Sequence, residues 1–220
     1  MILSLNTNEL FHYVCSQLNT FLPDLKPIDT HLKSCLNDTL DRVTMCFNKI
    51  IIPYYKKDGQ TTFNHLHTDQ YSMFLYLLSN EVWNRYQDFN VASKIMYLNK
   101  ILHSINCMYE VKLPEYFCFY HTVGTVIGKS AKFSNYVLIC HGVTIGEQGG
   151  KGPFLGERVS LLPKSSVVGD SKIGSNSSIG IGTTIYNKNV PEDSIAFIDT
   201  NGKVTIKNTE KCYNNNIFIR

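Results

Sequence analysis

Two histidines occupy equivalent places in a repeating pattern and could carry proton chemistry. His121 and His141 are each the third residue of a six-residue segment that opens with an apolar residue, Phe119 and Ile139 respectively. An imidazole titrates near neutral pH, so it can take a proton from one group and return it to another. It is also a common zinc ligand, but a zinc site needs a third protein ligand that this pattern does not supply. The pattern therefore favours acid–base chemistry.

The repeat that positions these histidines is clearest from Leu155 to Val190. Written in sixes the stretch reads LGERVS, LLPKSS, VVGDSK, IGSNSS, IGIGTT and IYNKNV. A period of six fits neither an amphipathic helix nor a half-buried strand. It fits a parallel β-helix in which each hexad forms one face, and three hexads complete a turn. Residues 18 apart then stack on neighbouring coils about 4.8 Å apart.

The hexads can be traced back to Cys107, with two interruptions. Two extra residues follow the hexad of Phe119, and a Gly-rich insertion from Glu147 to Pro153 separates the earlier coils from Leu155. Counting faces in turn places His121, His141, Pro163 and Ile181 in one column on successive coils. Long loops on a solenoid often serve binding, so we expect the insertion to fold over this column.

The first part of the chain shows the apolar spacing of α-helices. Apolar residues recur at helical spacing in four segments, which are residues 10–22, 32–52, 68–83 and 91–105. The third has the clearest apolar stripe, and Thr68 or Asp69 can cap its start. We expect a helical domain over residues 1–106, serving packing and oligomerisation, a β-helix over 107–190, and a C-terminal piece over 191–220. The fold class is α+β.

The C-terminal piece reads as two strands around Asn201-Gly202, a hairpin signal. We expect the hairpin to cap the open end of the solenoid, and the Asn-rich residues after it to be loosely held.

Composition excludes several classes of protein. The formal net charge is +3, so nothing calls for nucleic acid or a membrane surface. Seven cysteines without a CxxC pair indicate reduced thiols in a cytoplasmic protein. We expect no signal peptide and no membrane-spanning helix.

Together these residues resemble a known family. The stretch His121-TVGTVIGKSA, then Val143-TIG, then the six hexads, is similar to the hexapeptide-repeat acyltransferases and most closely to the serine acetyltransferases. The resemblance covers about residues 65–190. It implies a left-handed β-helix behind a helical domain, a homotrimer that can pair into a dimer of trimers, and acetyl-CoA as co-substrate in a groove between subunits. It requires no metal.

The resemblance also assigns roles to particular residues. His121 falls on the family's catalytic general base. His141, Gly146, Pro163 and Ile181 are expected to line acetyl-CoA, with backbone N–H groups near Gly146 stabilising the oxyanion. The C-terminal hairpin could instead form a wall for the CoA adenine.

Several positions depart from the family. Asn106 stands where an aspartate usually orients the base, so a nearby acid would have to be Glu110 or Glu115. Tyr120 replaces the aspartate before the base, and Lys151 and Gly152 replace an Arg-His pair that holds the substrate carboxylate.

The helical domain also departs from the family. Its acidic residue that reaches the substrate amino group corresponds roughly to His65, with His67 and Asp69 beside it. We therefore expect His67, Asp69 and Tyr120 to contact the acceptor, and the acceptor to be a hydroxyl of a sugar or glycan precursor at least as readily as serine.

Three other functions fit parts of the pattern. One is an N-acetyltransferase that acts on an amino sugar with the same base and co-substrate. Another is a β-helix metalloenzyme, which needs one histidine more than the column offers. The last is a non-catalytic scaffold, which would bind no acetyl-CoA.

Overall fold

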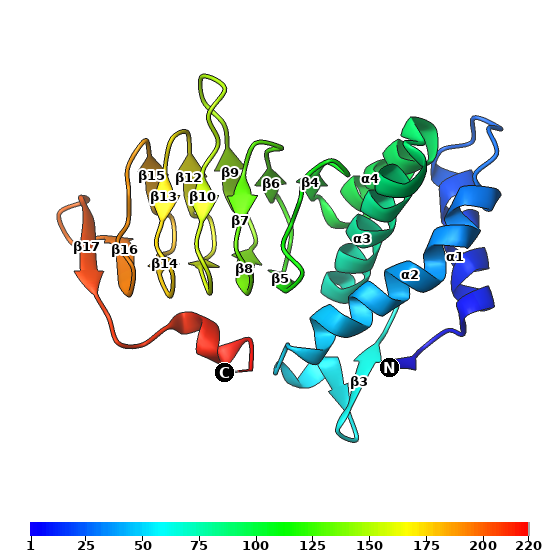
Figure 1. The fold of residues 1–220 in the computed structure, drawn as a ribbon, viewed down its shortest axis with the longest axis horizontal. Coiled ribbons are helices and arrows are strands. Elements are labelled where there is room, and N and C mark those ends of the chain that lie inside the picture. The colour runs from blue at the N-terminus through cyan, green and yellow to red at the C-terminus, as the bar shows by residue number, and fades with distance from the viewer. Residues whose placement is uncertain (220) are drawn as a thin grey trace.

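The computed structural model describes residues 1–219, with a helical domain at one end and a β-helix at the other (Figure 1). Four helices form the first part: α1 (Thr7–Phe21), α2 (Asp29–Asn48), α3 (Thr68–Tyr86) and α4 (Phe89–His103). Their places agree with the four segments predicted from apolar spacing. None of these helices is long and apolar enough to cross a membrane.

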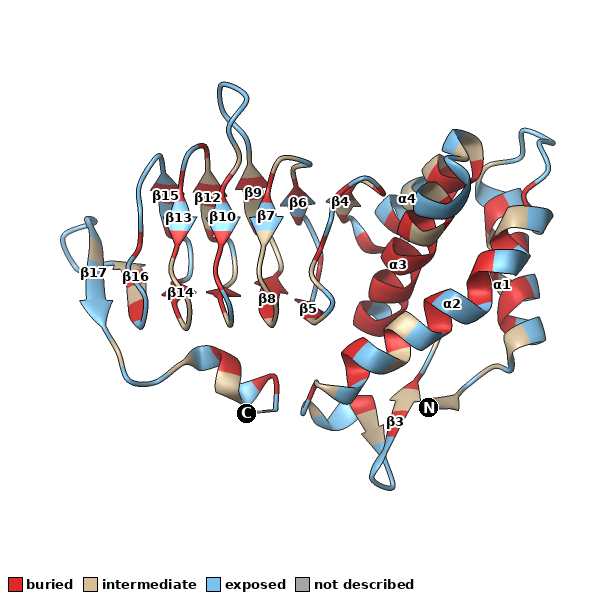
Figure 2. Cartoon of the chain, viewed as in Figure 1, coloured by how far each residue is buried: buried red, intermediate tan, exposed pale blue. Residues whose placement is uncertain are grey.

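Helix α3 is the centre of this domain and not a surface helix. It packs against α2, α4 and the first long strand of the β-helix, and most of its residues are buried (Figure 2). The predicted single stripe was therefore too narrow, because Met73, Leu77 and Asn80 are buried as well. The predicted cap was also wrong. The N-cap is His67, without a side-chain hydrogen bond, and the Asp69 carboxylate points elsewhere.

A small sheet beside the helices was not predicted. It has the order β1-β3-β2, from β1 (Ile2–Leu3), β2 (Lys56–Lys57) and β3 (Gln60–Phe63), with a 3₁₀ turn at Pro53–Tyr55. Strands of two to four residues are too short to show an alternating pattern.

The β-helix consists of three parallel sheets. The β8 sheet contains β5 (Phe117–Tyr120), β8 (Val137–Cys140), β11 (Ser160–Leu161), β14 (Ser178–Ile179) and β16 (Ser194–Ile198). The β9 sheet contains β4 (Asn106–Cys107), β6 (Val126–Ile127), β9 (Thr144–Gly146), β12 (Ser166–Val168) and β15 (Thr184–Tyr186). The β10 sheet contains β7 (Lys132–Phe133), β10 (Phe154–Leu155) and β13 (Lys172–Ile173).

The observed register confirms the hexad count. Phe119 pairs with Ile139, Ile139 with Leu161, and Leu161 with Ile179. Each of these side chains is fully buried, so the apolar residue that opens a hexad fills the interior of the prism. The pairing of Cys107 with Ile127 starts the β9 sheet where the sequence predicted.

The chain ends in a hairpin followed by a segment that returns to the helices. Strand β17 (Val204–Asn208) pairs antiparallel with β16, and β16 adds to β14, so the predicted hairpin covers the last coil. Residues 209–219, here called the C-terminal strap, then run back past the β8 sheet to the helical domain (Figure 1).

The strap is firmly attached, so the expectation of a loosely held end was wrong. Fully buried Asn214 donates hydrogen bonds to the carbonyl oxygens of Tyr136 and Val159. Phe218 is also fully buried and bridges to Ile50 in the helical domain.

Candidate active site

His121 lies at the corner where the chain leaves β5 and turns towards the β9 sheet. Its backbone has φ of 56°, in the left-handed region that few non-glycine residues adopt. The side chain is 64% exposed, and its ring centroid lies 4.3 Å from that of Tyr120. The corner therefore presents the imidazole outward, in a left-handed backbone conformation that Arg158 and Lys164 also adopt in this β-helix.

Asp69 is the group that holds this corner. It is in the first turn of α3, and one carboxylate oxygen, Oδ1, accepts a hydrogen bond of 2.9 Å from the backbone N–H of His121. The other, Oδ2, lies 3.7 Å from His121 Nδ1. The Asp69 side chain is only 5% exposed. The carboxylate therefore fixes the backbone of His121 and places a negative charge beside its ring.

The acid beside His121 is thus not one of the two suggested by the sequence. Asn106 donates its backbone N–H to Thr125 within the ladder, and the ion pair of His121 is with Asp69 rather than Glu110 or Glu115. Asp69 is 52 residues away in sequence. It reaches the corner because α3 packs against β5.

The electrostatics of the pair follow from burial. Burial raises the pKa of Asp69, because a charged carboxylate loses hydration, while the nearby His121 opposes that rise. A cationic imidazole would relieve the buried charge. Asp69 therefore presents a poorly hydrated carboxylate beside the imidazole of His121.

The two histidines before α3 have different surroundings. His65 Nδ1 is 2.8 Å from Ser4 Oγ, and its ring packs edge-on against Tyr13. His65 is thus part of the packing around the N-terminus. His67 instead lies near the rings of Tyr54 and Tyr55, and its Nδ1 is buried with no hydrogen-bond partner among the described residues. Of the two, His67 is close enough to affect the charge of Asp69.

The predicted column is present on successive coils above His121. The backbone N–H of Lys164 donates to the His141 carbonyl, and that of Gly182 to the Pro163 carbonyl. Because these corner groups already pair with one another, a ligand along the column would meet side chains. Ile181 is 68% exposed there. Gly146 lies instead within β9 opposite Val168, so it is in the sheet that leads away from the column.

The Gly-rich insertion does not fold over the column of its own chain. It leaves from the end of β9, at the corner between the β9 and β10 sheets, and projects between β9 and β10 (Figure 1). Its base is held there, because Ser130 Oγ donates to Glu147 Oε2 and Asn187 Nδ2 donates to Gln148 Oε1. The expectation was wrong because a loop after β9 starts at the opposite edge of that sheet.

Other chemistry has less support in the described residues. No three His, Cys, Asp or Glu side chains gather into a possible metal-binding cluster within residues 1–219. Six of the seven cysteines are buried, and burial raises the pKa of Cys46 and of Cys140 to about 12. Such thiols are poor nucleophiles near neutral pH.

The C-terminal strap carries Tyr213, whose pKa is raised by burial and, to a smaller extent, by Cys140 and Tyr120.

Comparison with known proteins gives the family resemblance. No family model matches the chain. The serine acetyltransferase of Staphylococcus aureus strain Mu50 is 27% identical over 138 residues, which are 61% of this chain and 62% of that protein. The one from Mycobacterium tuberculosis H37Rv is 38% identical over 79 residues, or 34% of each chain. The match thus spans less than two thirds of these relatives.

Solved structures extend the likeness to nearly the whole chain. The serine acetyltransferase of Brucella abortus S19 superposes with a TM-score of 0.72 at 16% identity, covering 94% of this chain and 85% of that one. A serine acetyltransferase in complex with CoA gives 0.68 at 17% identity, covering 92% and 85%. The chain therefore has the fold of the serine acetyltransferases, a helical domain followed by a β-helix, and is similar to them in sequence over up to 138 residues.

Proposed function

We propose that this protein is an acetyl-CoA-dependent O-acetyltransferase in which His121 is the general base. The observation that carries the proposal is the pair at the first corner, an exposed imidazole with a buried carboxylate 3.7 Å from its Nδ1. The similarity to serine acetyltransferases, one of them in complex with CoA, supports the same reaction.

The pair suits the proton transfers of acyl transfer. With Nδ1 turned to Asp69, the Nε2 atom of His121 is free to accept the proton of an acceptor hydroxyl. The hydroxyl oxygen then attacks the thioester carbonyl carbon, and the C–S bond breaks. The proton passes from His121 to the departing thiolate, so the base is regenerated. Asp69 stabilises the imidazolium that exists between these transfers.

The column of corner residues fits the uncharged arm of acetyl-CoA. Above His121 it offers the side chains of His141 and Pro163 and the exposed apolar surface of Ile181. We assign these residues, with Gly146, to the acetyl-CoA site. A groove needs a second wall, which one chain does not supply on this side. A neighbouring copy in a homotrimer would supply it, with its own insertion near His121, and two trimers could pair through their helical domains.

The acceptor would approach from the helical domain. Asp69 is buried behind the base, Tyr120 lies against its ring, and the unpaired Nδ1 of His67 can bond a polar group. We propose that Tyr120 and His67 contact the acceptor, a hydroxyl of a small molecule such as a sugar, a glycan precursor or serine. Asp69, which was also expected to contact the acceptor, is only 5% exposed and acts through His121.

Thiol release from acetyl-CoA, measured with a panel of serine, sugars, amino sugars and nucleotide sugars, tests the activity. His121→Ala should lower turnover by about 100-fold or more, since a general base typically contributes 10²–10⁴-fold. Binding of acetyl-CoA should be nearly unchanged. His65→Ala is the matched control, because His65 bonds Ser4 away from the corner. A loss below about threefold for His121→Ala would rule out this base.

A further inference from the structure

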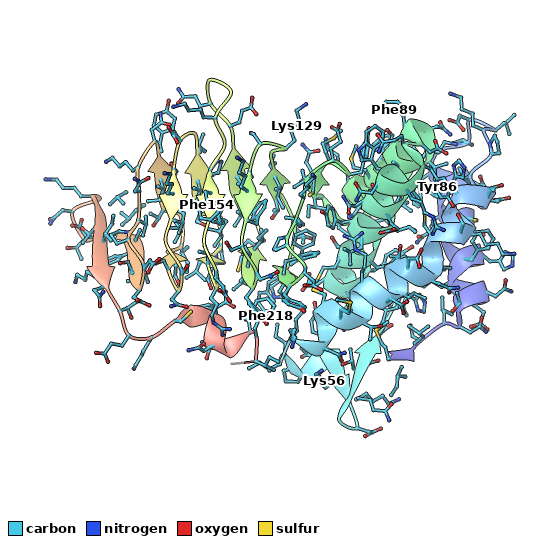
Figure 3. The ribbon with its side chains drawn as sticks, in the orientation of Figure 1. Lys56, Tyr86, Phe89, Lys129, Phe154 and Phe218 are labelled. Atoms are coloured by element: carbon cyan, nitrogen blue, oxygen red, sulfur yellow. The ribbon has the colours of Figure 1, made fainter. Side chains whose placement is uncertain are left out.

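A groove lies across the β-helix from the His121 column, over the β10 sheet. Its volume is about 860 Å³, and it is bounded by the corner at Lys129–Ala131, the insertion at Gly150–Gly152 and the corner at Asp170–Ser171. Figure 3 labels Lys129 and Phe154, which lie along it. None of the residues assigned above to the base, the acceptor or acetyl-CoA lines this groove.

The floor of the groove is one row of the β10 sheet. Lys132 pairs with Phe154, and Phe154 with Lys172, so the three occupy successive rungs. Adjacent rungs are about 4.8 Å apart. Their sequence neighbours Leu155 and Ile173 are fully buried, whereas these three are exposed, with Phe154 at 42%. An outward aromatic ring is therefore flanked on both sides by an outward ammonium group.

The charge of the groove stands out from the rest of the chain. Five lysines line it, with only two acids, Glu110 and Asp170; the lysines are Lys112, Lys129, Lys132, Lys151 and Lys172. Lys151 is paired with Asp170 at 2.8 Å. The excess of three positive charges equals the formal net charge of the whole chain. Positive charge is thus concentrated here and balanced elsewhere.

The walls of the groove are held by close packing. A Cβ atom on Gly152 would lie 2.4 Å from the carbonyl oxygen of Ser130, so only glycine allows the insertion to approach this corner. The hydrogen bonds from Ser130 to Glu147 and from Asn187 to Gln148 hold the base of the insertion. The groove is therefore formed before any ligand arrives.

We propose that this groove binds a nucleoside diphosphate group, with the base stacked on Phe154 and the phosphates paired with the ammonium groups of Lys132 and Lys172 on the flanking rungs. Aromatic rings stack with any nucleobase, and lysine is a common partner of phosphate. Two molecules carry this group: the nucleotide half of CoA, and an acceptor linked to a nucleotide. The proposal does not depend on His121, because binding is measured without turnover.

Calorimetric titration with ADP, UDP and inorganic pyrophosphate tests the site. Phe154→Ala should weaken ADP and UDP at least about fivefold and leave pyrophosphate unchanged, since only the nucleosides stack. Lys132→Gln and Lys172→Gln should each weaken all three by about tenfold, because a charged hydrogen bond is lost. Exposed Lys57 and Phe89, in the helical domain, give the controls Lys57→Gln and Phe89→Ala, which should change nothing.

The same variants distinguish the nucleotide half of CoA from an acceptor linked to a nucleotide. A higher KM for acetyl-CoA in Lys172→Gln assigns the site to the nucleotide of CoA. Tighter binding of nucleotide sugars than of CoA, with an unchanged acetyl-CoA KM, assigns it to the acceptor. Absence of nucleotide binding, an unaltered affinity in Phe154→Ala, or an equal loss in Lys57→Gln overturns the proposal. Thermal melting of each variant confirms that it is folded.

Discussion

Replacing Asp69 with asparagine removes the buried charge beside His121 and little else. The amide keeps the size of the side chain, and its oxygen can still accept the 2.9 Å hydrogen bond from the backbone of His121. Asp69→Ala removes both the charge and that hydrogen bond. Comparison of the two variants therefore separates stabilisation of the imidazolium from the fixing of the corner.

The distance sets the size of the expected effect. Two unit charges 3.7 Å apart attract each other by about 1 kcal/mol in bulk water and about 4.5 kcal/mol at the effective dielectric constant of a protein surface. The His121 ring is 64% exposed, so the lower part of this range applies. A loss of about 1–2 kcal/mol corresponds to roughly a 5- to 30-fold lower kcat/KM.

Steady-state thiol release with the best acceptor measures this loss. Asp69→Asn should lower kcat/KM by that factor, and Asp69→Ala should lower it further, by roughly another tenfold for the hydrogen bond. Asp38→Asn is the control, since Asp38 forms an exposed ion pair with Arg85 in the helical domain. If Asp69→Asn retains full activity, the charge of Asp69 does not assist His121, and the reasoning from the 3.7 Å separation fails.

Asp69→Asn should lower activity but should not lower the stability of the folded protein. Because burial raises the pKa of Asp69 above its ordinary 3.8, the folded state holds this proton more tightly than the unfolded state. Its contribution to stability is fully present below pH 3.8 and is lost as the pH rises through the raised pKa. At pH 8 the ionised carboxylate is a liability that asparagine removes. Asp69→Asn should thus melt no lower than the wild type at pH 8, and its relative advantage should shrink as the pH approaches 4.

Three further variants test other parts of the structure. Burial lowers the pKa of His103 from 6.5 to about 4. The free energy of unfolding, measured in urea, should therefore fall by about 3 kcal/mol between pH 6.5 and pH 4, and His103→Phe should abolish this pH dependence. The same pH dependence in His103→Phe would contradict the prediction. Asn214→Ala should lower the free energy of unfolding by about 1–3 kcal/mol and make the strap sensitive to proteolysis, because two buried carbonyl groups lose their hydrogen-bond donor. Asn216 is exposed, so Asn216→Ala should change neither property. Equal effects of the two substitutions would show that Asn214 does not hold the strap. His67→Ala should raise the acceptor KM and leave that of acetyl-CoA alone, while His65→Ala should change neither; a kinetically silent His67→Ala would remove it from the site.

The repeat made the β-helix predictable almost to the residue. Each hexad carries its own apolar residue, so the register of Phe119, Ile139, Leu161 and Ile179 follows from counting. The helices were found for a similar reason, since apolar residues recur at their period. The hexad repeat and the helical spacing of apolar residues are both local patterns that recur many times along the sequence.

The parts that sequence reasoning missed depend on single contacts between distant segments. Asp69 was expected to cap α3 or to contact the acceptor, and only the packing of α3 on β5 turns its carboxylate to His121. Asn214 looked like part of a polar tail, yet the carbonyl oxygens of Tyr136 and Val159 offer it buried partners. The partners of these two side chains come from distant segments, and no pattern in the sequence records where those segments meet.

The C-terminal strap changes how such a solenoid can come apart. In a repeat protein each coil contacts only its neighbours, so the last coil can open while the others stay closed. Here the backbone N–H of Ile219 bonds the carbonyl of Lys49, and that of Ile51 bonds Ile217, so the far end of the chain is fastened to the end of α2. The strap closes the array into a ring. Coils cannot be lost from the open end until these hydrogen bonds break. The β-helix and the helical domain should therefore unfold as a single cooperative unit.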